Sequence, residues 1–247
     1  MKKQKINLRL VILLVFLALA IVAWIVYFLF PQKYFWEAIG SFNHYPKYFS
    51  RLDGKVVAGT EAVSPAVVAV MIDNFPDVYP QSCLGGEGSV VYEAPAEGVT
   101  TRFMQVMSAE SDFSKVGPVR SARPYYLDWL AEYGAGALYM HCGGAPEALV
   151  LIKTRKIFDA NEFYWGPYYW RDQNKIAPHN LFTGREKWQS LLDKYADKDN
   201  KPVWSGWNFS NSLDVGLGEP LREIAIKYFS GYTVAWRYKN DAESYER

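Results

Sequence analysis

The chain has few cysteines and none of the short motifs that identify common catalytic sites. Its 247 residues include only two cysteines, Cys83 and Cys142. Neither lies in a CxxC motif, so zinc binding by thiolates is not expected. Disulfide-dependent folds are small and cysteine-rich, and the pattern leaves open whether these two thiols pair. We expect no bound metal and no cofactor, because the phosphate-binding glycine motifs of nucleotide sites are also absent.

Clustered positive charge is lacking as well. The chain has 27 Lys and Arg against 26 Asp and Glu, and its formal net charge is +1. A protein that binds nucleic acid needs clustered Lys and Arg to neutralise phosphates. No basic run occurs here, so the sequence argues against nucleic acid as a partner.

One long stretch near the start has no charge at all. Residues 10–30 are uninterruptedly apolar, and at about 1.5 Å per residue a helix of this length spans the roughly 30 Å hydrocarbon layer of a bilayer. Four basic residues precede it: Lys2, Lys3, Lys5 and Arg9. The positive-inside bias places such a flank in the cytoplasm. We therefore expect a single-pass signal anchor that binds the lipid bilayer and leaves residues 31–247 extracytoplasmic.

A cleaved signal peptide is the alternative, since Ala18 and Ala20 have the spacing of a cleavage site. However, the apolar core of a signal peptide is only about 7–15 residues long, and here the apolar run continues to Phe30. No cysteine lies near the end of the run, so lipid attachment there is excluded.

Four short apolar runs predict buried strands, at residues 67–72, 89–92, 101–107 and 137–140. Helices are expected from Pro124 to about Tyr133 and from Pro146 to about Lys153, because proline is favoured in a first helical turn. A third helix is expected after the capping-box pattern Thr183-Gly-Arg-Glu186, with one apolar face formed by Trp188, Leu191, Leu192 and Tyr195. The pattern predicts an α/β fold, a mixed sheet flanked by helices.

Composition changes suggest the domain organisation. We expect a cytoplasmic N-terminus (1–9), a transmembrane helix (10–30), a juxtamembrane stalk (31–55), an α/β extracytoplasmic domain (56–200), a linker (201–220) and a final segment (221–247). In the final segment, apolar residues alternate on both sides of Ser230-Gly231, which predicts an antiparallel hairpin. We expect this hairpin to begin a small β-rich C-terminal domain that the sequence cuts short.

The stretch Gly117-Pro-Val-Arg-Ser-Ala-Arg-Pro124 carries the strongest functional signal. Pro118 and Pro124 stiffen the loop, which presents Arg120 and Arg123. An arginine side chain is a planar fork that can hold a carboxylate or phosphate by two hydrogen bonds. We call residues 117–124 the arginine corner and expect it to bind an anion. The alternative is that its arginines pair with carboxylates of the same fold.

Other polar residues at predicted strand ends and in loops extend this hypothesis. The candidate ligand-binding residues are Arg120, Ser121, Arg123, Asn74, His141, Arg171, Asp172, His179 and Asn180. The candidate catalytic residues are Asp73, Glu93, Glu97 and His141. In a glycan hydrolase, Glu93 or Glu97 would work with Asp73 as the acid and base. A divalent metal held by Asp73, Glu93, His141 and His179 could serve another hydrolase, although no HExxH motif supports it.

The segment 162–170 holds six aromatic residues around a Gly-Pro pair. Such rings could stack on sugars. The alternative, which general statistics favour, is that they cover the core.

In this order, the motifs resemble the YerB-like family of bacterial envelope proteins, which carries the domain of unknown function 3048. The matching motifs are Val70-Met-Ile-Asp-Asn74, Val91-Tyr-Glu93, Thr101-Arg-Phe103, Gly117–Pro124, His141 with Gly143-Gly144, Trp170-Arg-Asp172 and Ala177-Pro-His-Asn180. The resemblance implies an α/β N-terminal domain, a smaller β-rich C-terminal domain and an extracytoplasmic location. Many relatives look like lipoproteins, whereas this chain has a transmembrane segment.

Together these features predict a membrane-anchored binding module. Its expected partners are an anionic cell-wall component such as peptidoglycan, or an envelope protein. A cell-wall hydrolase is the alternative, so the sequence leaves enzymatic activity undecided.

Overall fold

The computed structural model describes residues 15–22, 24, 48–86, 88–196, 204–207, 209, 221–242 and 244–247. The chain divides into two compact units, Met1–Pro46 and Lys47–Arg247. In the first unit, residues 15–22 are helical. No helix within the described ranges is long and apolar enough to cross a bilayer. The expected N-terminus 1–9, most of 10–30, most of the stalk and most of the linker lie outside the described residues.

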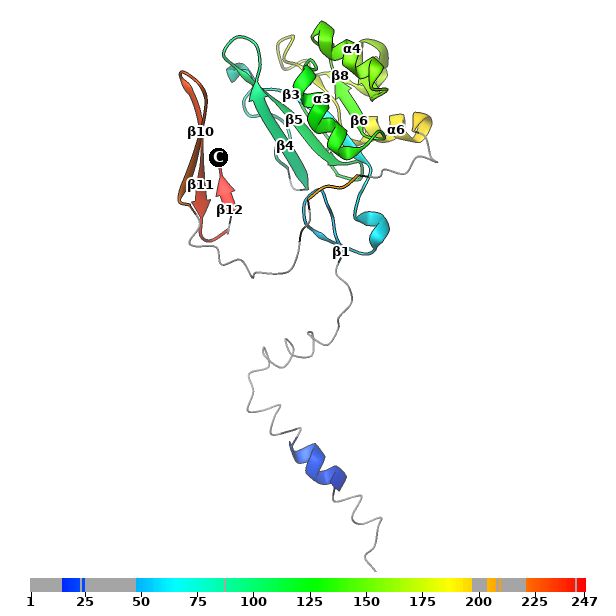
Figure 1. Ribbon diagram of the computed structural model, residues 1–247, viewed down its shortest axis with the longest axis vertical. Helices are drawn as coiled ribbons and strands as arrows, with labels where there is room; N and C mark the ends of the chain where they lie inside the picture. Colours follow the sequence, from blue (N-terminus) through cyan, green and yellow to red (C-terminus); the bar gives the residue numbers. More distant parts are fainter. Residues whose placement is uncertain are drawn as a thin grey trace, which may run out of the picture. The chain divides into compact units, whose positions relative to one another are not determined.

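The second unit is built around a five-stranded mixed sheet (Figure 1). In spatial order its strands are β4 (Ser89–Pro95), β5 (Thr101–Ser108), β3 (Val67–Asp73), β6 (Leu138–His141) and β7 (Phe158–Asn161). Strands β3, β6 and β7 are parallel, whereas β5 is antiparallel to β3 and to β4. All four predicted strands are therefore confirmed within one sheet, and β7 is an addition that the patterns do not predict.

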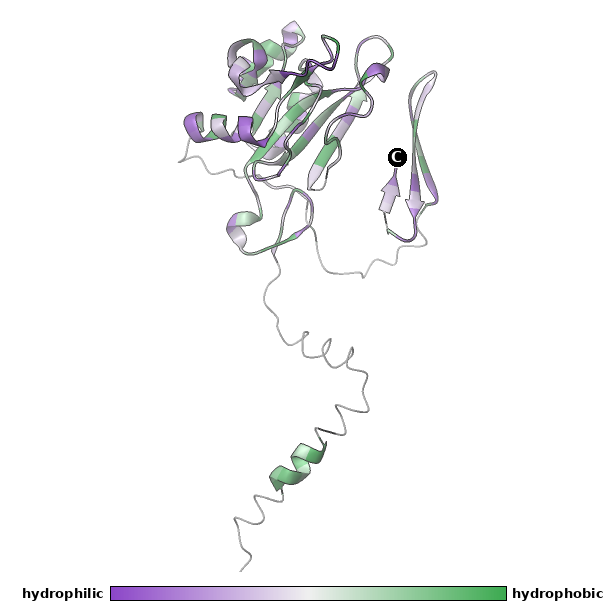
Figure 2. Cartoon of the chain, turned by 180° about the vertical axis from the view of Figure 1, so that it is seen from behind, coloured by the Kyte–Doolittle hydropathy of each residue, from purple (hydrophilic) through white to green (hydrophobic). Residues whose placement is uncertain are grey.

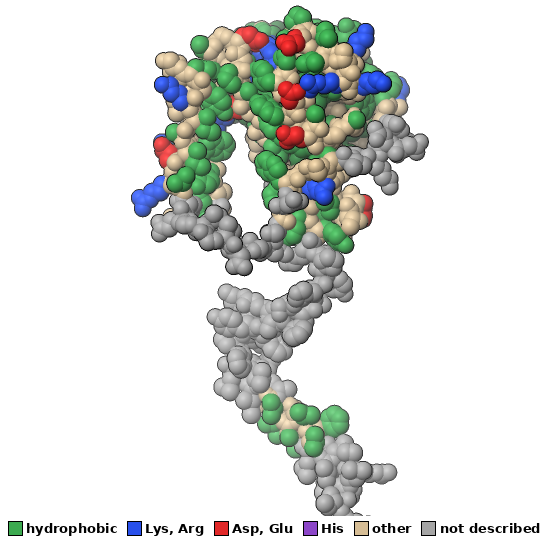
Figure 3. Space-filling view, in the orientation of Figure 1, with side chains coloured by type: hydrophobic (Ala, Val, Ile, Leu, Met, Phe, Trp, Pro, Cys, Tyr) green, Lys and Arg blue, Asp and Glu red, His purple; other side chains and the backbone are tan. Residues whose placement is uncertain are grey.

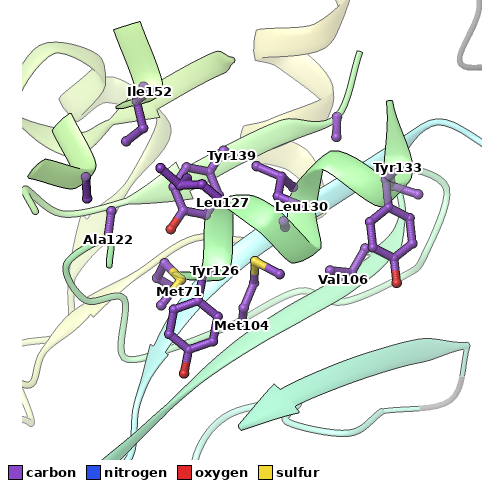
Figure 4. Close-up of a cluster of buried hydrophobic side chains, with 14 of the residues drawn as sticks. Met71, Met104, Val106, Ala122, Tyr126, Leu127, Leu130, Tyr133, Tyr139 and Ile152 are labelled. Atoms are coloured by element: carbon purple, nitrogen blue, oxygen red, sulfur yellow. The ribbon is translucent and has the colours of Figure 1, made fainter. Parts of the chain in front are cut away.

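The central strand β3 is buried on both faces, which explains its continuous apolar run. On one face, α3 (Pro124–Leu130) and α4 (Pro146–Thr154) pack on alternate residues of the sheet (Figure 4). On the other face, α6 (Arg185–Tyr195) contributes Trp188 and Leu191 to a second core. The mixed α/β fold with helices flanking the sheet is thus confirmed.

The helix predictions hold, with one correction at a cap. The helix that begins at Pro124 continues after α3 as a 3-10 helix (Ala131–Tyr133) and ends at Gly134, whose φ is +76°. The capping box predicted at Thr183 does not form. Gly184 is the N-cap of α6, because Thr183 is buried in a bridge to Val116 and its hydroxyl donates to the Tyr168 carbonyl at 3.0 Å.

Shorter elements surround the main sheet. Two small strand pairs are β1 (Tyr48–Phe49) with β2 (Val56–Val57), and β8 (Trp170–Arg171) with β9 (Leu181–Phe182). Another short helix, α5 (Glu162–Trp165), follows β7. Figure 2 shows that apolar residues gather in the strands of the five-stranded sheet.

The C-terminal residues form a separate three-stranded antiparallel sheet. Strands β10 (Glu223–Phe229) and β11 (Tyr232–Lys239) are joined at Ser230-Gly231, which confirms the predicted hairpin. Strand β12 (Ser244–Glu246) pairs with β11 and was not predicted. Val234 is buried in this sheet, and Ile224 and Ile226 on β10 are exposed.

Candidate anion-binding site at the strand ends

The topology of the sheet brings the candidate polar residues to one edge. Strands β3, β4, β6 and β7 run in one direction, so their carboxyl ends lie together, and the amino end of β5 joins them. The residues that this edge presents include Asp73 on β3, Glu93 on β4, Arg102 on β5 and His141 on β6. In open α/β sheets, ligands commonly bind beyond the carboxyl ends of the strands.

Asp73 links the arginine corner to the loop of His179. The Nδ1 atom of His179 lies 2.6 Å from Asp73 Oδ2, and the Nε atom of Arg120 lies 3.1 Å from the same oxygen. The Arg120 N–H is not aligned for a hydrogen bond, so this contact is an ion pair only. Phe75 stacks on the His179 ring with 5.4 Å between centroids. In the described part of the chain, the Nη groups of Arg120 donate no hydrogen bond, and its side chain is 25% exposed.

Arg123 is held by Glu97. Its Nε and Nη2 groups donate to the two carboxylate oxygens of Glu97, which is the bidentate geometry that arginine favours. Hydrogen bonding to Arg123 holds the pKa of Glu97 at about 2, against an ordinary value of 4.5. Both arginines of the corner therefore have a carboxylate of the same fold as a partner, as the alternative interpretation of the sequence expected.

Arg102 is the residue that the sequence patterns missed. It lies at the start of β5, is only 7% exposed, and donates from Nη1 to the Ser121 carbonyl at 3.1 Å. Its Nε is buried and has no hydrogen-bond partner. Burial, together with the nearby Arg123 and Arg120, lowers the pKa of Arg102. The corner thus contains a buried guanidinium without a hydrogen-bonded carboxylate, and Ser121 takes part through its backbone only.

Glu93 forms a second polar cluster at the same edge. Its Oε1 accepts hydrogen bonds from Thr101 at 2.6 Å, Asn74 at 3.3 Å and Tyr232 at 3.1 Å. Arg247 donates to the same oxygen at 3.2 Å. Tyr232 lies on β11 and Arg247 directly follows β12, so the C-terminal sheet contacts the edge that carries the arginine corner.

His141 does not face this cluster. It is fully buried, its Nδ1 lies 2.7 Å from the Gly143 carbonyl oxygen, and its Nε2 lies 2.8 Å from Asp159 Oδ1. Both ring nitrogens are therefore occupied by acceptors from the fold. This arrangement fixes the loop after β6 and leaves no ring nitrogen for a ligand or a proton transfer.

Arg171, Asp172 and Asn180 form a third group, on β8 and around β9. Arg171 donates to Asn180 Oδ1 at 3.0 Å and to Glu162 Oε1 at 3.3 Å. Asp172 pairs with Lys115, which lowers the pKa of that carboxyl. Arg171 is 41% exposed, so it remains accessible to a ligand despite these partners.

The arrangement limits the chemistry that the edge can perform. Among the described residues, no group of three or more His, Cys, Asp or Glu could hold a metal ion, so Asp73, Glu93, His141 and His179 do not form the metal set considered above. Glu97 is ionised at ordinary pH and is therefore unsuited to the role of a general acid.

Both cysteines are free thiols. Cys83 is exposed, and Cys142 is half-buried with its Sγ 3.5 Å from Glu162 Oε2. Burial and Glu162 raise the pKa of Cys142, so this thiol is a poor nucleophile.

A cleft of about 650 Å³ in the second unit lies elsewhere. It is lined by residues at the opposite end of the sheet, such as Pro65, Ala66 and Ser108. None of the candidate site residues lines it.

Comparison with known proteins identifies a family of unknown function and a similar solved structure. The family model described as "Protein of unknown function (DUF3048) N-terminal domain" matches residues 52–200. The crystal structure of the YerB protein from Bacillus subtilis is similar, with a TM-score of 0.66 and 25% sequence identity. The match covers 81% of this chain but only 66% of that one, just under two thirds of its length. No functionally curated protein matches this chain.

Proposed function

The chain belongs to the YerB-like DUF3048 family, and from its strand-end site we propose that it binds an anionic component of the bacterial cell wall. The proposed ligand group is a carboxylate or a phosphate, held by Arg102, Arg120 and Arg123. Residues 10–30 would tether the chain to the membrane, with the site on the extracytoplasmic side. An envelope partner protein with an acidic surface group is the other ligand that this chemistry admits.

The observation that carries this proposal is the buried guanidinium of Arg102, whose Nε has no hydrogen-bond partner and which donates to no carboxylate among the described residues. A buried donor left without an acceptor costs about 1–3 kcal/mol, and more on a charged group, and a ligand that supplies the acceptor would offset this cost. An anion beside Arg102 and the free Nη groups of Arg120 would supply the missing acceptors. Arg123 would join when the ligand displaces Glu97, whose side chain is 64% exposed.

Cosedimentation of the full chain, in mild detergent, with purified cell walls tests the proposal. We expect wild type to bind and added salt to weaken the binding, since surface electrostatics are screened. The Arg120→Gln/Arg123→Gln variant should bind about tenfold more weakly or worse, because charge-assisted hydrogen bonds contribute about 1.5–3 kcal/mol each.

The matched control is Arg155→Gln/Arg185→Gln. It removes the same charge from two exposed arginines that pair with Asp128 and Glu110. Equal binding by wild type and the corner variant, both folded, would rule out the arginine corner as the site.

A hydrolase is the second candidate, and one contact favours it. Asp73 accepts from Nδ1 of His179, which would leave Nε2 as a base beside an anion held by Arg120. Release of soluble fragments from cell walls by wild type but not by His179→Gln would support this activity. Equal release by both would remove His179 from that role.

A further inference from the structure

Two large aromatic side chains are exposed beside the arginine corner. Phe163 is 69% exposed and Tyr164 is 81% exposed, and both belong to α5, which follows β7 at the same edge of the sheet. The Asn161 side chain holds this segment, since its Oδ1 accepts from the N–H groups of Phe163 at 3.3 Å and Gly143 at 2.9 Å. We call Phe163 and Tyr164 the aromatic platform. Contiguous exposed apolar surface is a feature of interaction sites, and these two rings are neighbours in the chain.

Backbone contacts join the aromatic platform to the corner. The Cys142 N–H donates to the Arg120 carbonyl at 3.0 Å, and the Ala122 N–H donates to the Gly143 carbonyl at 3.0 Å. Gly143 has a φ of +62°, and a Cβ atom there would lie 3.0 Å from the Phe163 ring. The ring therefore packs on Gly143, which is itself hydrogen-bonded to Ala122 in the loop that presents the arginines.

We propose that the ligand is an anionic polysaccharide, with one sugar ring stacked on the aromatic platform and an adjacent phosphate or carboxylate held by the arginine corner. This inference rests on the proposed function and adds the sugar as its second element. The C–H groups on one face of a pyranose form an apolar surface that matches an aromatic ring. Tyr164 adds a hydroxyl at the rim for the sugar's own hydroxyls.

Charge distribution favours a polysaccharide over an anionic membrane surface. Binding to an anionic bilayer relies on clustered Lys and Arg. Basic and acidic side chains are interspersed on the face of the second unit that Figure 3 shows, and carboxylates also lie at the strand-end edge. Glu162 lies next to Phe163, and the exposed Glu97 flanks Arg123. These carboxylates would repel a continuous anionic surface, but one isolated anionic group of a polymer can fit between them.

The test compares Phe163→Ala/Tyr164→Ala with Trp207→Ala, which removes a ring that is 61% exposed elsewhere. Binding of the full chain in mild detergent is measured on cell walls, on walls stripped of phosphate-bearing polymer, and with inorganic phosphate alone. We expect the platform variant to bind walls about tenfold more weakly, the scale of one aromatic contact. It should bind inorganic phosphate as wild type does, and Trp207→Ala should match wild type throughout.

The binding measurements on the different ligands distinguish the possible outcomes. Loss of binding to stripped walls assigns the anion as phosphate, and retained binding assigns it as carboxylate; both support the inference. Equal wall binding by wild type and the platform variant overturns the stacking and leaves the proposed function intact. No wall binding by wild type overturns both. Displacement by a soluble short-chain anionic phospholipid, but not by wall polysaccharide fragments, assigns the site to lipid and overturns the inference.

Discussion

Asp73 and His179 lie in direct contact, with 2.6 Å between Oδ2 and Nδ1, and Arg120 Nε lies 3.1 Å from the same oxygen. The Asp73 side chain is only 6% exposed. Replacing it by asparagine would leave the guanidinium without its carboxylate. We expect Asp73→Asn to lower the free energy of unfolding by about 3–5 kcal/mol, the scale of breaking a buried ion pair, as measured by denaturant titration.

Asp128→Asn is the matched control for this substitution. Asp128 also pairs with an arginine, Arg155, but its side chain is 66% exposed. Exposed pairs contribute about 1 kcal/mol or less. If both variants lost a similarly small amount of unfolding free energy, the stabilising role of Asp73 would be contradicted.

The ion pair between Glu97 and Arg123 predicts a pH dependence. Since the pKa of Glu97 falls from 4.5 to about 2 on folding, the unfolded chain takes up this proton first as the pH drops. The contribution of the pair is complete above pH 4.5 and is lost as the pH falls toward 2. Because Glu97 is largely exposed, we expect this ion pair to contribute about 1 kcal/mol or less to the free energy of unfolding. The stability difference between wild type and Glu97→Gln, measured against pH, should vanish in that window.

Glu97→Gln, which is expected to lower the stability of the fold, is expected to strengthen ligand binding. Glu97→Gln frees Arg123 from its internal partner, so we expect tighter binding to cell walls, by a few fold. Arg123→Gln should weaken binding. Weaker binding in both variants would instead assign Glu97 to ligand contact.

Tyr228 on β10 reports the contact between the C-terminal sheet and Glu93. Burial, followed by the charge and hydrogen bond of Glu93, raises the pKa of Tyr228 to about 12. Glu93→Gln should lower it, as read from the chemical shifts of labelled tyrosine rings. Tyr133, whose pKa burial raises without Glu93, is the internal control. An unchanged Tyr228 titration would show that the contact is absent in solution.

Gly143 supports the aromatic platform and has a positive φ of +62°. Gly143→Ala would add a Cβ atom 3.0 Å from the Phe163 ring and place an L-residue in the left-handed region. We expect a loss of about 1–2 kcal/mol in the free energy of unfolding together with weaker wall binding. Gly98→Ala is the control, since its φ is +70° but a Cβ there has no neighbour within 4 Å. Equal wall binding by both variants would count against the platform.

Much of the fold is readable from the sequence because its signals are local. The β-branched run at Val67–Asp73 and the proline that begins α3 each identify an element without its neighbours. Strand β7 has only Phe158 and Ala160 as apolar residues, and it exists because it pairs with β6. Such long-range pairing leaves little trace in a four-residue segment.

In the candidate site, too, features with a local sequence signal were predictable and those that depend on long-range packing were not. The strand ends predicted that Asp73 would lie near the arginine corner, and the structure places Arg120 beside it. Arg102 was missed because its burial depends on the packing of the corner over β5, which no local pattern records. His141 was expected to face a ligand, but its partner Asp159 lies on the unpredicted strand β7.

The most direct test of anion binding at the corner observes the arginine side chains themselves. With ¹⁵N-labelled arginine, the Nε signals of the full chain are followed as soluble cell-wall polymer is added. We expect shifts at Arg102, Arg120 and Arg123, with Arg155 and Arg185 unchanged. Binding of the polymer without shifts at the corner, or with equal shifts at all five arginines, would contradict anion binding at the corner.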